Sequence, residues 1–379
     1  MEVKIGAKGG LALLTAAHLM SDVYFSFTIT LLPLWVSLFD LPFSAVGLLI
    51  FLQNAGFAAL VPISGYFADR TARPTFGIGM LIVALTMSAV GFAPSYSALI
   101  VLVLIATIGQ ALFAPQAAST AAHSSGSLRG LGLSIYLTGG TLGGSLGPMA
   151  IAALVTTAGL QRAWLMMLPG LLLAAMLSRA FAARGEAPGG IRRPGAIRSS
   201  LDMGPVLALV CVLVLRGAAE TGIISFLPLL IEQKGGGLIA VGTTVGLFKL
   251  SCAAGTLIGG LLSQRKGWKP MMVLSLVLAV PLCCGLLRAD GFLALVFVAL
   301  LGAALRASFP YAFLIAQRLL PEHSSTAAGL VLSLSLLGGG LGALGEGFLA
   351  DGVGVEMALL IVGVTLPLGA AVAAVGLRE

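Results

Sequence analysis

The amino-acid sequence predicts an all-α membrane protein with twelve transmembrane helices in two six-helix halves, and three observations predict it. First, 58% of the 379 residues are hydrophobic and only 9% are charged, whereas a soluble domain carries about 25% charged residues. Second, the apolar runs are long and continuous, as helices of about 20 membrane-spanning residues require, and they lack the short alternating pattern of an outer-membrane barrel. Third, the two halves of the chain resemble each other.

The composition also excludes several classes of protein. With so few charged residues the chain cannot cover a water-facing surface, which excludes a soluble enzyme, a disordered protein and a nucleic-acid binder despite the net charge of +7. We expect no metal and no cofactor, because the cysteines lie inside apolar runs, lack metal-ligand spacing and are typical of small buried hydrophobes. These cysteines are Cys211, Cys252, Cys283 and Cys284.

The apolar run from Gly10 to Phe39 predicts a first transmembrane helix rather than a cleaved leader, because it is long and contains His18 and Asp22. Residues 183–202 are rich in Gly, Pro and Arg and predict a linker that divides the spans six and six. The twelve predicted spans are residues 10–38, 43–68, 75–93, 96–121, 127–156, 162–182, 203–231, 238–263, 270–287, 291–317, 324–350 and 354–377.

The linker defines two domains, an N-terminal half over 1–182 and a C-terminal half over 203–379. With both termini in the cytoplasm, fifteen of the 21 Lys and Arg residues lie on the cytoplasmic side, three lie outside and three lie within spans. Such a bias orients membrane proteins. We therefore expect a multi-pass protein of the plasma membrane, the inner membrane of a bacterium, with the lipid bilayer around it.

Short segments recur between the halves at an offset of about 200 residues. HSS at 123–125 returns at 323–325, and LTGGTLGG at 137–144 returns as LLGGGLGA at 336–343. Several matches at nearly one offset indicate a parallel duplication. Parallel repeats of six helices are the architecture of the major facilitator superfamily, with the substrate site near the middle of the bilayer.

Two motifs resemble those of the same superfamily. Gly65-x-x-x-Asp69-Arg70-x-x-Arg73 lies between the second and third spans, where that superfamily carries its Gly-x-x-x-Asp-Arg-x-x-Arg loop. Gly139-x3-Gly143-x3-Gly147-Pro148 in the fifth span is similar to the glycine-proline motif of its proton-coupled drug exporters. The resemblance implies gating residues, for which we select Gly65, Asp69, Arg70, Arg73, Gly143, Gly147 and Pro148.

The first half is also similar to the fosmidomycin-resistance group of these exporters. The segments that carry this resemblance are HLMSD at 18–22, GYFADR at 65–70 and the run at 133–148. The group has a Phe-His-Pro-Glu-Ser-like stretch in its fourth span, whereas this chain reads Phe-Ala-Pro-Gln-Ala at 113–117. The ionisable pair of that stretch is therefore absent here.

Polar side chains inside the spans mark candidate functional positions, because such groups are expensive in lipid. Asp22 is the predicted proton carrier and His18, four residues earlier on the same helix face, tunes it. Arg216 and Glu220 form a similar pair, either as a fixed structural ion pair or as part of the coupling site. The candidate substrate-binding residues are Arg216, Lys249, Arg306, Gln53, Asn54, Gln110, Glu346, Tyr24 and Tyr311, and Glu220 joins the proton-coupling residues.

Two or three cations facing a cavity favour an anionic or zwitterionic substrate, unless Lys249 is paired with Glu220 or Glu346. The sequence thus predicts a secondary transporter, acting as a monomer without a cofactor, that exchanges protons for a small amphipathic or anionic compound such as an antibiotic by alternating access. A proton symporter that imports an organic anion, metabolite or siderophore is the alternative. A membrane enzyme is disfavoured because the spans show no catalytic motif.

Overall fold

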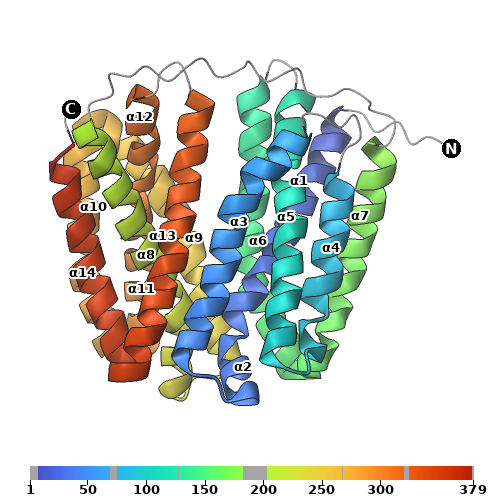
Figure 1. Cartoon of the computed structure of the whole chain (residues 1–379), viewed down its shortest axis with the longest axis horizontal. Helices are drawn as coiled ribbons and strands as arrows, with labels where there is room; N and C mark the ends of the chain where they lie inside the picture. The colour runs from blue at the N-terminus through green and yellow to red at the C-terminus, as the bar shows by residue number, and fades with distance from the viewer. Residues whose placement is uncertain are drawn as a thin grey trace. The chain divides into compact units, whose positions relative to one another are not determined.

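The computed structural model describes residues 7–68, 75–125, 128–181, 203–266, 268–319 and 324–377. Within these ranges every regular element is a helix, which confirms the predicted all-α class (Figure 1). Eleven of the described helical segments are long and apolar enough to cross a membrane, and a shorter apolar segment covers Phe76–Phe92. The predicted linker at 183–202 and the predicted loop at 69–74 lie outside the described residues.

The helices of each half follow the predicted spans. The first series is α1 (Ala7–Thr30), α2 (Leu32–Phe39), α3 (Phe43–Ala68), α4 (Phe76–Ser88), η1 (Val90–Phe92), α5 (Tyr96–Ser124), α6 (Arg129–Ala158), η3 (Leu160–Met166) and α7 (Met167–Phe181). The second series is α8 (Met203–Gln233), α9 (Leu238–Lys266), α10 (Trp268–Arg288), α11 (Gly291–Ala307), α12 (Phe309–Leu319), α13 (Ser324–Val353) and α14 (Val355–Val375).

Two spans that we predicted as continuous, 10–38 and 291–317, are each divided into two α-helices. The breaks fall between α1 and α2 and between α11 and α12. Pro33 and Pro310 lie in the first turn of the helix that follows each break. A proline ring has no amide hydrogen to donate and clashes with the carbonyl four residues earlier, which favours ending the preceding helix.

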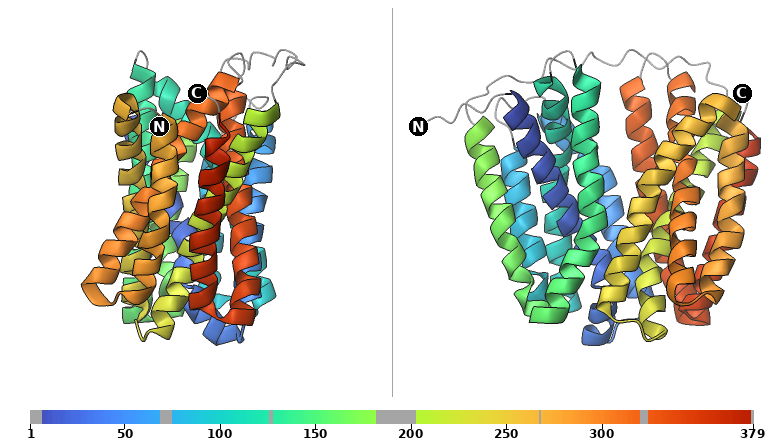
Figure 2. Two further views of the ribbon diagram at one scale, coloured as in Figure 1. Left: turned by 90° about the vertical axis from the view of Figure 1, so that its left-hand side faces the viewer. Right: turned by 180° about the vertical axis from the view of Figure 1, so that it is seen from behind.

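The chain forms two compact units that do not coincide with consecutive halves. The first unit contains Met1–Leu31 and Ala59–Arg192, and the second contains Leu32–Ala58 and Arg193–Glu379. The helix α2 and the first part of α3 therefore pack with the helices that follow the linker. Within each unit the helices run alongside one another (Figure 2).

In the first unit, α6 packs on α1 through glycines spaced four residues apart. A Cβ atom on Gly139 would meet Thr15, one on Gly143 would overlap the carbonyl of Leu19, and one on Gly147 would meet Val23. Small residues at this spacing allow two helix backbones to approach closely. The glycine run that resembles an exporter motif is thus a contact surface between two helices.

This contact predicts opposite effects for two glycines of α6. Gly143→Ala should destabilise the protein by about 1–3 kcal/mol, because an inserted methyl group overpacks a tight interface. Gly130→Ala should be neutral or stabilising, because open space surrounds Gly130 and alanine is the better helix former. Thermal unfolding in detergent measures both, and an equal Tm for the two variants would contradict the tight contact.

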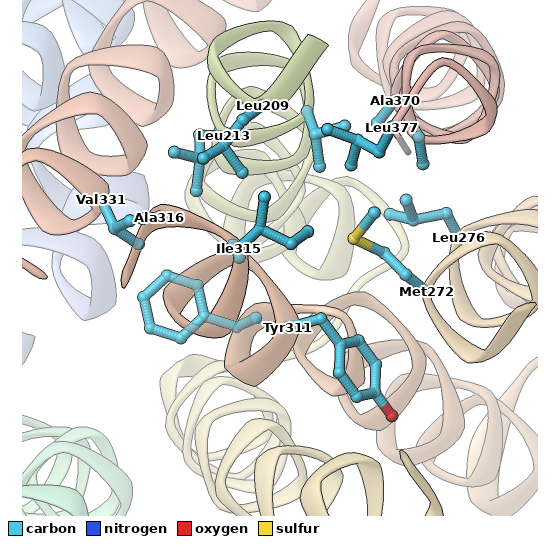
Figure 3. Packing of buried hydrophobic residues seen from close by; sticks show 14 of the residues in the cluster. Leu209, Leu213, Met272, Leu276, Tyr311, Ile315, Ala316, Val331, Ala370 and Leu377 are labelled. Carbon is cyan, nitrogen blue, oxygen red and sulfur yellow. The ribbon is translucent and has the colours of Figure 1, made fainter. Parts of the chain in front are cut away.

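In the second unit, a hydrophobic cluster joins α8, α10, α12 and α14 (Figure 3). Leu209, Met272, Ile315 and Ala370 represent these four helices in the cluster. Tyr311 is completely buried in it, and its hydroxyl donates to the carbonyl of Gly259 at 2.5 Å. The cluster anchors the short helix α12, whose first residue contacts the charged groups described below.

The start of α3 is capped by a carboxylate from the end of α13, within the second unit. Asp351 Oδ1 accepts from the amide of Phe43 at 2.6 Å, and Oδ2 accepts from the amide of Ser44 at 3.0 Å. The first amides of a helix have no partner within the helix, and its positive end favours an anion. Gly47 and Gly347 bring the two helix backbones into close contact beside this cap.

Asp351→Ala should lower the stability by about 1 kcal/mol, the usual contribution of a helix cap. Asp351→Asn should lose less, because one amide oxygen remains to accept a hydrogen bond while the charge is lost. Thermal unfolding of the three proteins in one detergent checks the order. Equal stability of all three would show that the cap contributes nothing.

Candidate functional site

One polar cluster of the first unit lies on α1. Nε2 of His18 is 3.8 Å from Oδ2 of Asp22, and both side chains are mostly buried, at 14% and 29% exposed. Gln110 of α5 donates from Nε2 to the other oxygen of Asp22 at 3.3 Å. The structure therefore adds Gln110, which the sequence predicted separately, to the predicted pair of His18 and Asp22.

The backbone of α6 determines which nitrogen of His18 carries a proton. Nδ1 is 2.9 Å from the carbonyl oxygen of Tyr136. A carbonyl oxygen can only accept, so Nδ1 donates and the proton is on that nitrogen. Nε2 is consequently the nitrogen that can gain or lose a proton, and it is the one that faces Asp22.

The imidazole of His18 is held in place by the ring of Tyr136 and by a glycine. The two rings stack with centroids 4.2 Å apart and 15° between their planes. A Cβ atom on Gly140 would overlap the imidazole, so a glycine is required beside it. With its ring fixed, His18 and Asp22 can share one proton, either as a neutral acid beside neutral imidazole or as a carboxylate beside imidazolium.

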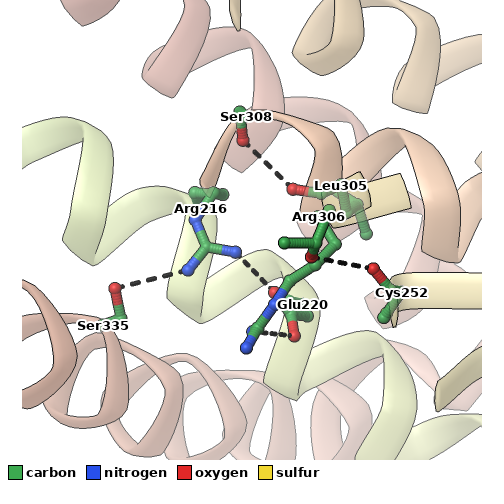
Figure 4. Close-up of polar contacts among 8 residues, drawn as sticks. Arg216, Glu220, Cys252, Leu305, Arg306, Ser308 and Ser335 are labelled. Carbon is green, nitrogen blue, oxygen red and sulfur yellow. Dashed lines mark hydrogen bonds and ion pairs between the residues drawn. The ribbon is translucent and has the colours of Figure 1, made fainter. Parts of the chain in front are cut away.

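The second unit holds a cluster of two arginines around one carboxylate (Figure 4). Glu220 Oε2 binds Nη1 of Arg216 at 2.5 Å, and Glu220 Oε1 binds Nη1 of Arg306 at 2.6 Å. Arg216 also donates from Nη2 to Ser335 at 3.3 Å. The carboxylate thus bridges α8 and α11, and these three ionised groups leave one positive charge in excess.

Both guanidinium groups also lie over the ring of Phe309. The Cζ atoms of Arg216 and Arg306 are 4.6 Å and 4.3 Å from its centroid, a distance at which the ring face attracts cations. Arg216 is 1% exposed, whereas Arg306 is 33% exposed. Arg306 is therefore the more exposed of the two cations in this cluster.

Other predicted substrate residues have structural partners in their own unit. Tyr24 is fully buried and donates to the carbonyl of Met166 at 2.5 Å, as Tyr311 does to Gly259. Asn54 donates to the carbonyl of Ile50 within α3 at 2.9 Å. Gln53 is buried, and Lys249 is half-buried on α9.

Glu346 is 1% exposed on α13, and neither carboxyl oxygen has a hydrogen-bond partner among the described residues. The hydrogen-bonded pair of Lys249 and Glu346 that we considered is therefore absent from this conformation. The Arg216–Glu220 pair that we considered is present and is extended by Arg306.

The predicted gating residues are described only in part. Asp69, Arg70 and Arg73 lie outside the described residues, and Gly65 lies in α3 with open space where a Cβ would stand. Gly143 and Gly147 contact α1, and Pro148 lies inside the continuous helix α6.

Four residues that hold the two polar clusters or a neighbouring helix in place were not among our predicted site residues. Tyr136, Phe309 and Ser335 support the two clusters, and Gln116 caps α4 by accepting from the amide of Thr75 at 2.6 Å. Ser335 lies directly before the repeated glycine run at 336–343, whereas none of the motifs described above includes Phe309. Nothing about these single residues in the sequence specifies their partners, which come from other helices. No group of three His, Cys, Asp or Glu in the described part is placed to hold a metal.

Comparisons with known proteins were made on the whole chain. The sequence profile of the Major Facilitator Superfamily matches residues 14–343 and, again, residues 209–379. The fosmidomycin resistance protein of Escherichia coli is 28% identical over 359 residues, covering 92% of this chain and 88% of that protein. The multi-drug resistance efflux pump PmrA of Streptococcus pneumoniae is 31% identical over 162 residues, covering 41% of this chain and 40% of that protein.

Solved structures share the fold at low sequence identity. A bacterial homologue of the human lysosomal transporter Spinster, in an inward-facing and occupied conformation, has a TM-score of 0.76 at 18% identity, covering 97% of this chain and 93% of that one. The nucleoside transporter NupG has a TM-score of 0.75 at 14% identity, covering 98% of this chain and 99% of that one.

Proposed function

Because the chain belongs to the Major Facilitator Superfamily, we propose that it is a proton-coupled exporter of a small anionic or amphipathic compound. Members of this superfamily are membrane transporters rather than enzymes, and the chain is a multi-pass membrane protein of this kind. Alternating access would exchange the compound for protons across the bacterial inner membrane. Both termini would be cytoplasmic, and the chain would act as a monomer.

The His18–Asp22 pair is the observation that carries the proposal. The carboxylate of Asp22 lies beside the His18 ring nitrogen that is not bound to the Tyr136 carbonyl, so a proton can pass between the two side chains. Gln110 supports the carboxylate without neutralising its charge. If the pair had only a structural role, arginine would be a better partner for Asp22 than histidine, because arginine stays charged.

The Arg216–Glu220–Arg306 cluster supports an anionic or zwitterionic substrate. Its excess positive charge and the partial exposure of Arg306 favour a carboxylate or phosphonate group. The similarity to a fosmidomycin resistance protein and to a multi-drug efflux pump supports export. These names describe the relatives, and they indicate which compounds to test first.

The test uses purified protein in liposomes loaded with a pH-sensitive dye. Gradients of anionic phosphonates, organic acids and cationic drugs are imposed in turn, and internal pH is recorded. We expect at least one anionic compound to move protons in the direction opposite to its own. If protons move in the same direction as the compound, the protein is a symporter and the proposed exchange is wrong. Compound movement without any proton movement would refute coupling.

The loop between α3 and α4 provides a separate prediction on gating. Asp69→Asn should reduce the transport rate several-fold without changing the amount of protein in the membrane, because a carboxylate there can bind a helix N-terminus or a basic residue when the cytoplasmic side closes. Uptake assays with quantified expression test this expectation. An unchanged transport rate would indicate that the loop residues serve only to orient the protein in the membrane.

A further inference from the structure

Among the acids in the described ranges, Glu346 has the most deeply buried carboxyl group that the functional proposal does not use. It lies on α13 in a segment apolar enough to span a membrane, and it is 1% exposed. Neither oxygen has a hydrogen-bond partner in the described part of the chain. An ionised carboxylate in such a place would lose its hydration without compensation, whereas the neutral acid loses far less.

Groups from three other helices lie near this carboxyl. A Cβ atom on Gly222 of α8 would overlap Oε2 of Glu346, so the acid occupies space that a glycine leaves open. Val362 of α14 borders the same space. Cys283 of α10 is near enough to interact electrostatically with the acid, and its thiol faces the carbonyl of Leu359 at 3.7 Å.

Several charged groups on the packed helices are bound to other partners or located elsewhere. On α8, Arg216 and Glu220 bind each other, and Glu220 also binds Arg306. Asp351, further along α13, binds the first amides of α3. Glu356 is exposed on α14, and Arg318 lies in the last turn of α12. None of these groups forms a hydrogen bond with Glu346.

We propose that Glu346 is a second proton-binding site, separate from the His18–Asp22 pair, which holds its proton as a neutral carboxylic acid in this conformation. A movement of α13 away from Gly222 would admit water to the carboxyl and allow the proton to leave. Glu346 is then a site for a proton rather than for substrate. The protonation of this side chain does not depend on which substrate the protein carries.

A hydrophobic carbodiimide tests the protonation state directly in the native protein. Dicyclohexylcarbodiimide enters membranes and reacts with a protonated carboxyl, whose O–H proton adds to a carbodiimide nitrogen while the oxygen bonds to its central carbon. The O-acylisourea then rearranges to a stable N-acylurea. Mass spectrometry of the peptide that contains Glu346, after treatment at pH 7, should show at least tenfold more adduct than the peptide that contains Glu220. Absence of the adduct, or equal labelling of both peptides, would overturn the proposal.

A second measurement detects the proton by its effect on folding. If a proton is bound only in the folded state, the equilibrium constant for folding falls as the pH rises, by up to tenfold per pH unit. Glu346→Gln, which keeps the shape and cannot ionise, should remove that part of the pH dependence between pH 6 and 8. Identical pH dependence in the native protein and the variant would contradict the proposal. Labelling of Glu346 without proton transport in liposomes would instead refute the coupling proposal and leave this site standing.

Discussion

Asp22→Asn is expected to abolish proton movement driven by substrate in liposomes, to the level of empty vesicles. Asparagine has the shape of aspartate and keeps an oxygen that can accept from Gln110. It cannot take up a proton, so exchange of substrate for protons loses its carrier. The folded protein should remain, because the substitution preserves both the volume of the side chain and the hydrogen bond to α5.

The controls separate proton transfer from packing. Asp290→Asn changes an exposed carboxylate that binds Lys234 in the second unit, and it should transport normally. His18→Asn keeps a donor for the Tyr136 carbonyl and removes the nitrogen that faces Asp22. It should retain transport with an altered pH profile. If Asp22→Asn still moves protons against substrate, another group is the carrier.

Glu220→Gln is expected to produce the largest loss of stability, about 3–5 kcal/mol, because removing one partner from a buried ion pair leaves an uncompensated charge. Here it leaves two guanidinium groups on one aromatic ring. We expect little folded protein in detergent. Size-exclusion chromatography and thermal unfolding measure the loss.

Arg306→Gln should behave differently at the same cluster. Arg216 and Glu220 then remain as a balanced pair, so the protein should fold. The excess positive charge is lost, and affinity for anionic substrates should fall by at least tenfold while neutral compounds bind unchanged. The double variant Glu220→Gln/Arg306→Gln should regain part of the stability that Glu220→Gln loses. Equal affinities for anions in Arg306→Gln and the native protein would remove Arg306 from the substrate site.

Helix positions were predictable because their signal is local. A run of about 20 apolar residues must bury its backbone polar groups in a helix, and each predicted span corresponds to a described helix or helix pair. The divisions at Pro33 and Pro310 were not predicted. Pro62 and Pro115 lie inside unbroken helices of the same chain, so proline alone does not specify a break.

Contacts within one helix of the candidate site were predictable, and contacts between helices were not. Spacing of four placed His18 beside Asp22 and Arg216 beside Glu220, and both pairs are present. The contact of Arg306 with Glu220 joins residues 86 positions apart, and no periodicity within a helix contains that information. The same is true of Asp351, which caps a helix that begins 308 residues earlier.

The sequence by itself determined that this protein is a helical membrane protein, because hydropathy depends on residues close together in the chain. It also identified the acids and bases that a membrane interior makes expensive. Only the tertiary structure decided which of them neutralise one another, and that the carboxyl of Glu346 is buried without a hydrogen-bond partner among the described residues. Those relations depend on how helices from distant parts of the chain pack. The burial of a charged group and its distance from other charges determine its energy more than the type of residue does.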